Sequence, residues 1–161
     1  MKRFFRTRIK LRSAGRGFTL IEMIAAMTIM LVLTTIALPT AAVVVKREKE
    51  RELREDLRTM RNAIDRYKDF SDRGMIPTEM DTYGYPPTLD VLVKGVPLKG
   101  SKDKYKFLRN IPVDPMTGTT DWGMRSMQDD PDSQSWGGQD VFDVFSKSQG
   151  TGMNGIPYAN W

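Results

Sequence analysis

Hydrophobic residues form one long uninterrupted run near the beginning of the chain. From Met23 to Val45 there are 23 consecutive residues without a charge, and most of them are apolar. At about 1.5 Å per residue such a helix is about 35 Å long, enough to cross a hydrocarbon core of about 30 Å. The pattern predicts a transmembrane helix over residues 18–45, in which Glu22 is the only charged residue.

After this run the pattern changes to an amphipathic one. Apolar side chains recur at helical spacings of four and three residues: Leu53, Leu57, Met60, Ile64 and Tyr67. Acidic and basic residues lie between them, and Glu50/Arg54 and Arg51/Glu55 have the spacing of favourable helical ion pairs. We therefore expect the helix to continue as an amphipathic stalk over residues 46–74. A parallel coiled-coil dimer is the alternative to packing on the chain's own C-terminal domain, but only two heptads are present.

Residues 75–161 hold most of the Gly and Pro residues and all three Trp. Alternating apolar and polar positions predict strands within 122–127 and 141–146, joined by an acidic loop. Thr88 and Gly95 have the residue types that cap a short helix between them, and residues 105–108 fit a strand or a loop on the stalk. The predicted fold class is α+β, with a long N-terminal helix and a small antiparallel β-sheet head.

The positive net charge belongs to the first residues of the chain. Lys and Arg total 25 and Asp and Glu total 20, but seven of the positive residues and no acidic ones lie in residues 1–17. The remaining residues have a formal charge of −2. A nucleic-acid partner is therefore not expected. The basic flank orients the predicted span with its N-terminus in the cytoplasm.

The composition also argues against catalysis. The chain has no His and no Cys, which excludes a Ser-His-Asp triad, disulfides and the usual zinc sites. Asp140 and Asp143 are a candidate acid and base of the glycosidase type, but no supporting motif accompanies them. We expect no enzyme.

Two common kinds of membrane segment fit the N-terminus incompletely. A cleaved secretory signal would also start with basic residues and end at small ones such as Ala41 and Ala42, but its apolar region is usually only about 7 to 15 residues long. An uncleaved anchor fits the length and leaves Glu22 unexplained. A carboxylate in hydrocarbon costs about 2.5 to 3.5 kcal/mol on insertion scales, so a partner for Glu22 is expected.

The segment Arg16-Gly17-Phe18-Thr19-Leu20-Ile21-Glu22-Met23 resembles the processing site of type IV prepilins and type II secretion pseudopilins. The resemblance implies that residues 1–17 are a leader, that a prepilin peptidase cuts after Gly17, and that it methylates the new N-terminal residue, Phe18. It also implies that Glu22 pairs with the amine of Phe18 in an adjoining subunit, and that Pro39 kinks the helix in a way that serves assembly. From the residues alone, Glu22 reaching to lipid headgroups and a kink without function remain alternatives.

The C-terminal part resembles the major, G-type pseudopilin of type II secretion. Residues 111–115, Ile-Pro-Val-Asp-Pro, are similar to the turn that precedes the sheet in that family, and residues 143–161 are similar to its closing loop. In the family this loop binds Ca²⁺, which would make Asp143, Ser146 and Asn154 the ligands here. Because one carboxylate is a poor cage for Ca²⁺, a metal-free loop anchored by Trp161 is the alternative.

The resemblance implies a structural subunit of a type II secretion pseudopilus that serves protein export. Its expected location is the bacterial inner membrane, crossed once, with a periplasmic head. The expected partners are further copies of this chain, the prepilin peptidase, other pseudopilins, the inner-membrane secretion platform and membrane lipid. A subunit of a type IV pilus or competence fibre is the nearest alternative, and an anchored monomeric binding module is a more distant one.

Overall fold

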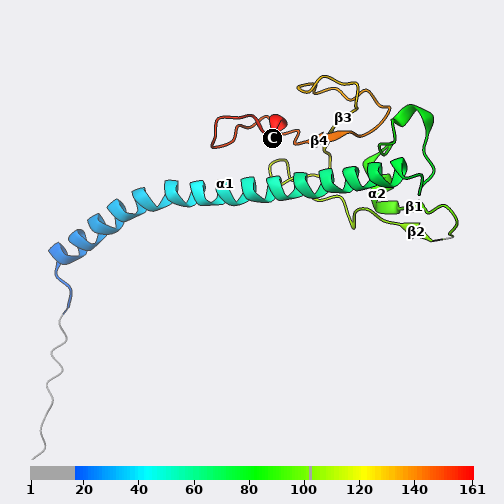
Figure 1. Cartoon of the computed structure of the whole chain (residues 1–161). Helices are drawn as coiled ribbons and strands as arrows, with labels where there is room; N and C mark the ends of the chain where they lie inside the picture. Colours follow the sequence, from blue (N-terminus) through cyan, green and yellow to red (C-terminus); the bar gives the residue numbers. More distant parts are fainter. Residues whose placement is uncertain (1–16, 102) are drawn as a thin grey trace, which may run out of the picture. The chain divides into compact units, whose positions relative to one another are not determined.

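The computed structural model describes residues 17–101 and 103–161, without the side chains of residues 36–40. The predicted leader therefore lies outside the described residues, except for Gly17. The chain divides into a first unit that ends at Ala42 and a second unit, Val43–Trp161. One helix, α1 (Leu20–Asp72), supplies residues to both units (Figure 1).

The first unit presents apolar side chains to its surroundings. All residues from 17 to 35 are exposed. The hydroxyls of Thr28 and Thr34 donate to the carbonyls of Ile24 and Met30, each at 2.7 Å, so they are satisfied within the helix. A helical surface that is apolar on every side is stable only when lipid or other apolar surfaces cover it.

A helix occupies the predicted range 18–45 from Leu20 onward, but its transmembrane character is not confirmed. Among the described residues, leaving aside the side chains of 36–40, no helix combines the length and apolar character that a membrane crossing needs. Helix α1 continues through position 39. The Pro39 side chain is not described, so the kink at Pro39 stays a prediction.

In the second unit, α1 ends in a Schellman motif. Gly74 has a φ of 67°, in the left-handed region that favours glycine. Its N–H donates to the carbonyl of Ser71 at 2.8 Å, and the N–H of Met75 donates to the carbonyl of Phe70 at 2.9 Å. The predicted stalk thus ends close to the expected position.

The predicted apolar stripe of α1 is buried by the head of the same chain. Its five members all belong to the core, together with residues from every part of the head: Ile76, Leu92, Trp122, Val141, Val144 and Tyr158. Since the head covers the stripe, the stripe is not available as the seam of a coiled-coil dimer.

Among the described residues, neither predicted ion pair, Glu50/Arg54 or Arg51/Glu55, is formed, and Arg51 pairs with Glu48 at 2.5 Å instead. Glu50 is buried and accepts hydrogen bonds from Met153 N at 2.9 Å and from the Tyr158 hydroxyl at 3.1 Å. The guanidinium of Arg54 lies 4.2 Å from the ring centre of Trp161. The C-terminal loop packs on this part of α1 and provides the partners of Glu50 and Arg54. Because these partners are about 100 residues away in the sequence, helical spacing gives no indication of them.

The head contains two small antiparallel sheets. Strand β1 (Val96–Pro97) pairs with β2 (Lys104–Tyr105), and β3 (Gly123–Arg125) pairs with β4 (Asp143–Phe145). Its helices are η1 (Met80–Thr82), α2 (Leu89–Lys94) and η2 (Tyr158–Asn160). The α+β fold class is confirmed, with shorter strands than predicted and with β1, whose proline weakens the strand pattern, as an addition.

Two details explain the local geometry of the head. Helix α2 has Thr88 and Gly95 at its ends as predicted, but the Thr88 side chain makes no capping bond, and its carbonyl accepts from Val91 N at 3.3 Å. In β3, a Cβ at position 123 would lie 2.3 Å from the Phe145 ring, so Gly123 is required for the close pairing of β3 with β4.

Candidate functional site

The N-terminal segment places the predicted cleavage site on exposed, non-helical backbone. Residues 17–19 precede α1 without regular structure, and Phe18 is 78 % exposed. A Cβ added at Gly17 would meet no described heavy atom within 4 Å. The peptide bond between Gly17 and Phe18 therefore has the accessibility that a peptidase requires.

Thr19 and Glu22 form a reciprocal capping box at the start of α1. The N–H of Glu22 donates to Thr19 Oγ1 at 3.3 Å, and the N–H of Thr19 donates to Glu22 Oε2 at 3.4 Å. The sequence pattern Thr-x-x-Glu is typical of this arrangement and could have indicated it. The bonds keep the Glu22 carboxylate beside the first helical turn, where the helix dipole also favours a negative charge.

The geometry brings Glu22 close to the position where a new charge would arise. Cleavage after Gly17 would create an amine on Phe18, one residue before the helix cap. The carboxylate and this amine would then lie at the same end of α1, which is compatible with pairing inside one chain or between two chains. The assignment of Glu22 to assembly, like that of Phe18 to methylation, stays a prediction.

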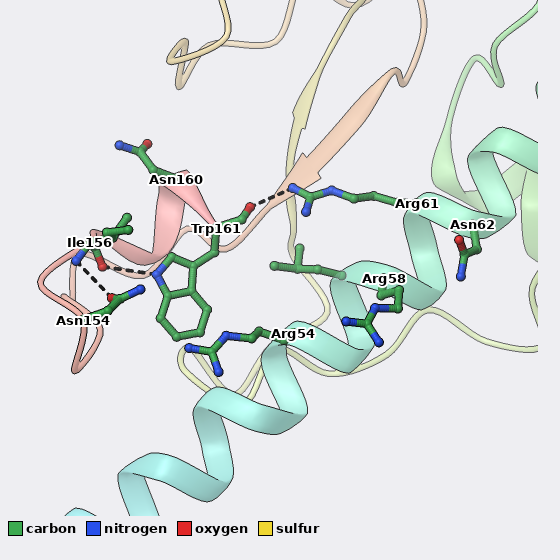
Figure 2. A pocket seen from close by; sticks show the side chains of 9 residues that line it. Arg54, Arg58, Arg61, Asn62, Asn154, Ile156, Asn160 and Trp161 are labelled. Carbon is green, nitrogen blue, oxygen red and sulfur yellow. Dashed lines mark hydrogen bonds between the residues drawn. The ribbon is translucent and has the colours of Figure 1, made fainter.

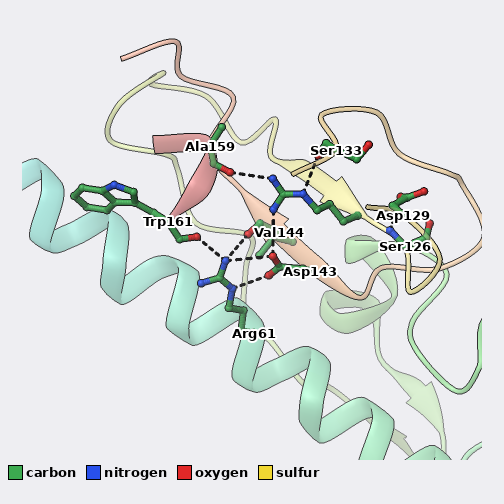
Figure 3. A network of polar contacts seen from close by, with 9 residues as sticks. Arg61, Ser126, Asp129, Ser133, Asp143, Val144, Ala159 and Trp161 are labelled. Atoms are coloured by element: carbon green, nitrogen blue, oxygen red, sulfur yellow. Dashed lines mark hydrogen bonds and ion pairs between the residues drawn. The ribbon is translucent and has the colours of Figure 1, made fainter. Parts of the chain in front are cut away.

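In the closing loop, the Asp143 carboxylate is bound by two guanidinium groups. Arg61 Nε donates to Asp143 Oδ1 at 2.6 Å, and Arg125 Nη1 lies 3.4 Å from Asp143 Oδ2. Arg61 also donates to the main-chain oxygens of Val144, at 3.1 Å, and Trp161, at 2.7 Å (Figure 3). Arg61 thus ties α1 to β4 and to the last residue of the chain.

Arg125 extends this network to the interior of the head. It is 5 % exposed, and its guanidinium lies 4.1 Å from the centre of the Phe145 ring. It donates to the carbonyls of Ser133, at 2.8 Å, and Ala159, at 3.0 Å. Two segments far apart in sequence, the 126–139 loop and η2, are therefore joined through one side chain.

The other two predicted Ca²⁺ ligands have separate partners. Ser146 Oγ donates to Oδ2 of the fully buried Asp114 at 2.6 Å, and Asn154 Oδ1 accepts from Ile156 N at 3.1 Å. Within the described part of the chain, no group of three or more acidic residues is close enough together to hold a metal ion.

The predicted calcium site does not fit this geometry. Ca²⁺ takes six to eight oxygen ligands, whereas the only carboxylate among the three predicted residues, that of Asp143, faces two guanidinium groups. The positive charge that this carboxylate needs comes from Arg61 and Arg125. Sequence reasoning missed both, although Arg61 follows Leu57 by four residues and precedes Ile64 by three, which places it on the buried face of the helix.

Trp161 anchors the end of the closing loop, as in the metal-free alternative. Its indole Nε1 donates to the carbonyl of Ile156 at 3.2 Å, and the centres of the Trp161 and Tyr158 rings are 5.1 Å apart. A Cβ at Gly152 would lie 2.3 Å from the indole ring, so the loop approaches Trp161 as closely as a glycine permits.

Asp140 is a fully buried residue of the head, and one of its carboxylate oxygens is unsatisfied among the described residues. Oδ1 accepts from Met127 N at 3.0 Å, whereas the buried Oδ2 has no partner among the described residues. Burial raises the pKa of Asp140, and the negative charge of Asp129 raises it further. Because Asp140 is fully buried and Asp143 is held by two arginines, the geometry gives no support to the acid and base roles considered for this pair.

We predict that Asp140→Asn stabilises the head near neutral pH. A carboxyl whose folded-state pKa is raised contributes its full stability below the ordinary value of 3.8 and loses it as the pH rises through the folded-state pKa. Since the amide carries no charge, the variant should be more stable than the wild type at neutral pH and about equally stable in acid. Urea unfolding of the full chain in detergent, followed by Trp fluorescence at several pH values, measures this difference. Asp132→Asn, in the exposed part of the same loop, is the control, and a gain for Asp140→Asn that is independent of pH contradicts the argument.

Comparison with known proteins bears on the N-terminal segment. Residues 12–38 match the family described as the prokaryotic N-terminal methylation motif. The matched range includes Gly17, Phe18 and Glu22, and it supports the pilin-like class of structural subunits that are processed by a prepilin peptidase and polymerise with similar subunits. No curated protein and no solved structure matches the chain.

Proposed function

We propose that this chain is the major structural subunit of a type II secretion pseudopilus. In this proposal, the prepilin peptidase removes residues 1–17, methylates Phe18, and releases a subunit that polymerises through the first part of α1 to drive protein export. The observation that carries the proposal is the methylation motif over residues 12–38, which in this structure leads from an exposed Gly17–Phe18 bond into a capped helix.

Polymerisation would bury the apolar surface of the first unit. Large apolar side chains lie on all sides of the helix, among them Leu20, Ile21, Ile29, Met30, Val32 and Leu33, each more than half exposed. Burying such side chains fully contributes about 1.5 to 3 kcal/mol each. Bundling with the same helix of other subunits would cover them without any further domain.

The same bundling would give Glu22 its partner. An unpaired ion in a low-dielectric bundle costs several kcal/mol, and the amine of Phe18 in a neighbouring subunit would offset this cost. Before assembly, we propose that the helix anchors the subunit in the inner membrane. The basic residues before it would keep the N-terminus in the cytoplasm, and the head would lie in the periplasm.

The organisation of the head supports the pseudopilus over a pilus. The Asp114 turn is tied to the closing loop through Ser146, so the two segments that resemble the G-type pseudopilin are in contact. The chain also lacks the pair of C-terminal cysteines common in type IV pilins. The other pseudopilins and the secretion platform would be its partners.

The intact mass of the chain recovered from membranes tests this proposal. We expect a mature chain that begins at Phe18 and carries one additional methyl group. Gly17→Val is the control: because no described atom crowds this position, the variant should fold normally and keep its leader. A wild-type chain that still begins at Met1, or that begins near Val43, excludes prepilin processing.

A further inference from the structure

Arg54 and Arg58 line a basic groove between α1 and the C-terminal loop. The groove encloses about 500 Å³, and Leu57, Ile156 and the Trp161 ring form its apolar surface (Figure 2). Asn154 and Asn160 line it from the C-terminal side. The groove therefore combines cationic, amide and apolar groups.

The guanidinium groups of Arg54 and Arg58 are available to bind an anionic group. Arg61 is bound to Asp143 and to the end of the chain, and the guanidinium of Arg54 lies over the Trp161 ring. Within the described residues, neither Arg54 nor Arg58 forms an ion pair, and both are exposed. A guanidinium prefers a carboxylate, which it binds through two parallel hydrogen bonds. The groove thus fits a segment that carries acidic groups around a small apolar one.

The loop over residues 126–139 presents such a segment. Its tip is Asp130-Pro131-Asp132, and all three residues are exposed. Within the described residues, the two carboxylates at the tip form no ion pair. The two carboxylates of the tip could therefore pair with Arg54 and Arg58, while Pro131 contacts the apolar surface of the groove.

Hydrogen bonds within the head fix the conformation of the 126–139 loop in the single chain. Asp129 accepts from Ser126 N at 2.7 Å and from Gly137 N at 3.0 Å, and these backbone bonds keep the pKa of Asp129 below its ordinary value. The Trp136 indole donates to the Asp140 carbonyl at 2.7 Å. A preorganised loop loses little conformational entropy when it binds.

We propose that the Asp130–Asp132 tip of one subunit docks in the Arg54/Arg58 groove of a second copy of this chain. The tip belongs to the loop between β3 and β4 (Figure 1). The groove is lined by α1 and the C-terminal loop. Two different, complementary patches form a heterologous contact, which repeats from subunit to subunit and produces an open filament when it does not close into a ring. The inference rests on the proposed function and assigns the head a part in the fibre contacts.

Site-specific crosslinking tests this contact. The chain has no Cys, so Arg58→Cys and Asp132→Cys each introduce a single thiol. A short bismaleimide is the appropriate reagent, because an Arg–Asp pair separates its Cα atoms beyond the about 4.4 to 6.8 Å that a disulfide spans. Membranes that contain both variants should give crosslinked dimers. Arg58→Cys with Asp81→Cys, another exposed acidic position, should give none.

Charge reversal provides the second measurement. Arg54→Glu/Arg58→Glu and Asp130→Arg/Asp132→Arg should each lower the fibre yield about tenfold, because like charges then face each other across the contact. The two reversals combined in one chain should restore assembly, whereas Arg66→Glu, at an exposed position outside the groove, should have no effect. Normal fibres from either double reversal, or no recovery in the combined variant, overturn the proposal.

The two proposals fail in different ways. If the chain is processed at Phe18 and assembles, but neither crosslinks nor responds to charge reversal, the docking contact is wrong and the pseudopilin function stands. If the chain keeps its leader while the mixed thiol variants still crosslink, the pseudopilin function is wrong and the contact between copies stands.

Discussion

Arg125→Ala should lower the free energy of unfolding by about 3 kcal/mol, the largest stability loss that we expect from a single polar residue here. The guanidinium is buried, and it donates to two carbonyls and faces the Asp143 carboxylate. Its removal leaves the carbonyls of Ser133 and Ala159 without these donors, and a buried carbonyl such as that of Ala159 costs about 1 to 3 kcal/mol when it is unsatisfied. The contact with the Phe145 ring is lost as well.

Urea unfolding of the full chain in detergent, followed by Trp fluorescence, measures this loss. Arg66→Ala is the matched control, since Arg66 is exposed and forms no ion pair in the described part of the chain, and it should change the stability by less than about 0.5 kcal/mol. Arg125→Lys should lie between the two, because an ammonium keeps the charge but not the planar fork that reaches several partners. A midpoint for Arg125→Ala equal to that of the wild type would show that the network does not stabilise the head.

Glu22→Leu should still be processed after Gly17 yet lower the yield of fibres at least about tenfold, because the amine of Phe18 then lacks its counter-ion in the bundle. The capping box complicates this variant, since leucine also removes the hydrogen bond from Thr19 N. Glu22→Gln separates the two effects. Glutamine is equally able to complete a capping box but carries no charge.

We therefore expect Glu22→Gln to assemble as poorly as Glu22→Leu, with the helix content of both near that of the wild type. Fibre yield by electron microscopy and the mass of the mature chain are the two measurements. Normal fibres from Glu22→Gln would assign Glu22 to the local helix cap and remove the argument for pairing between subunits. Thr19→Ala, which removes the other half of the box, should affect assembly less than either change at Glu22.

The elements that the sequence predicts well are those that depend on local periodicity. The stripe from Leu53 to Tyr67 repeats at the helical spacing, and all of it is buried in the structure. The segments around Gly123–Arg125 and Asp143–Phe145 alternate by two residues, and they form the pair β3 and β4. In each case, neighbours in the sequence carry the whole pattern.

The closing loop shows the limit of such reasoning. The resemblance assigned Asp143, Ser146 and Asn154 to one metal site, but each has other partners: two arginines, Asp114, and the backbone of Ile156. The decisive residue, Arg61, is 82 positions from Asp143 in the sequence. A single sequence contains no signal for a contact over such a separation.

By itself, the sequence determined the N-terminal helix, its apolar surface, the processing motif and the face of α1 that is buried, because each of these follows from residues within a few turns of one another. Only the tertiary structure decided what neutralises Asp143, why Glu50 is buried, and which arginines stay exposed beside Trp161. These outcomes depend on where the C-terminal loop meets α1. A buried charge or polar group costs free energy unless it has a partner, and for Asp143 and Glu50 the folded chain brings those partners from distant positions.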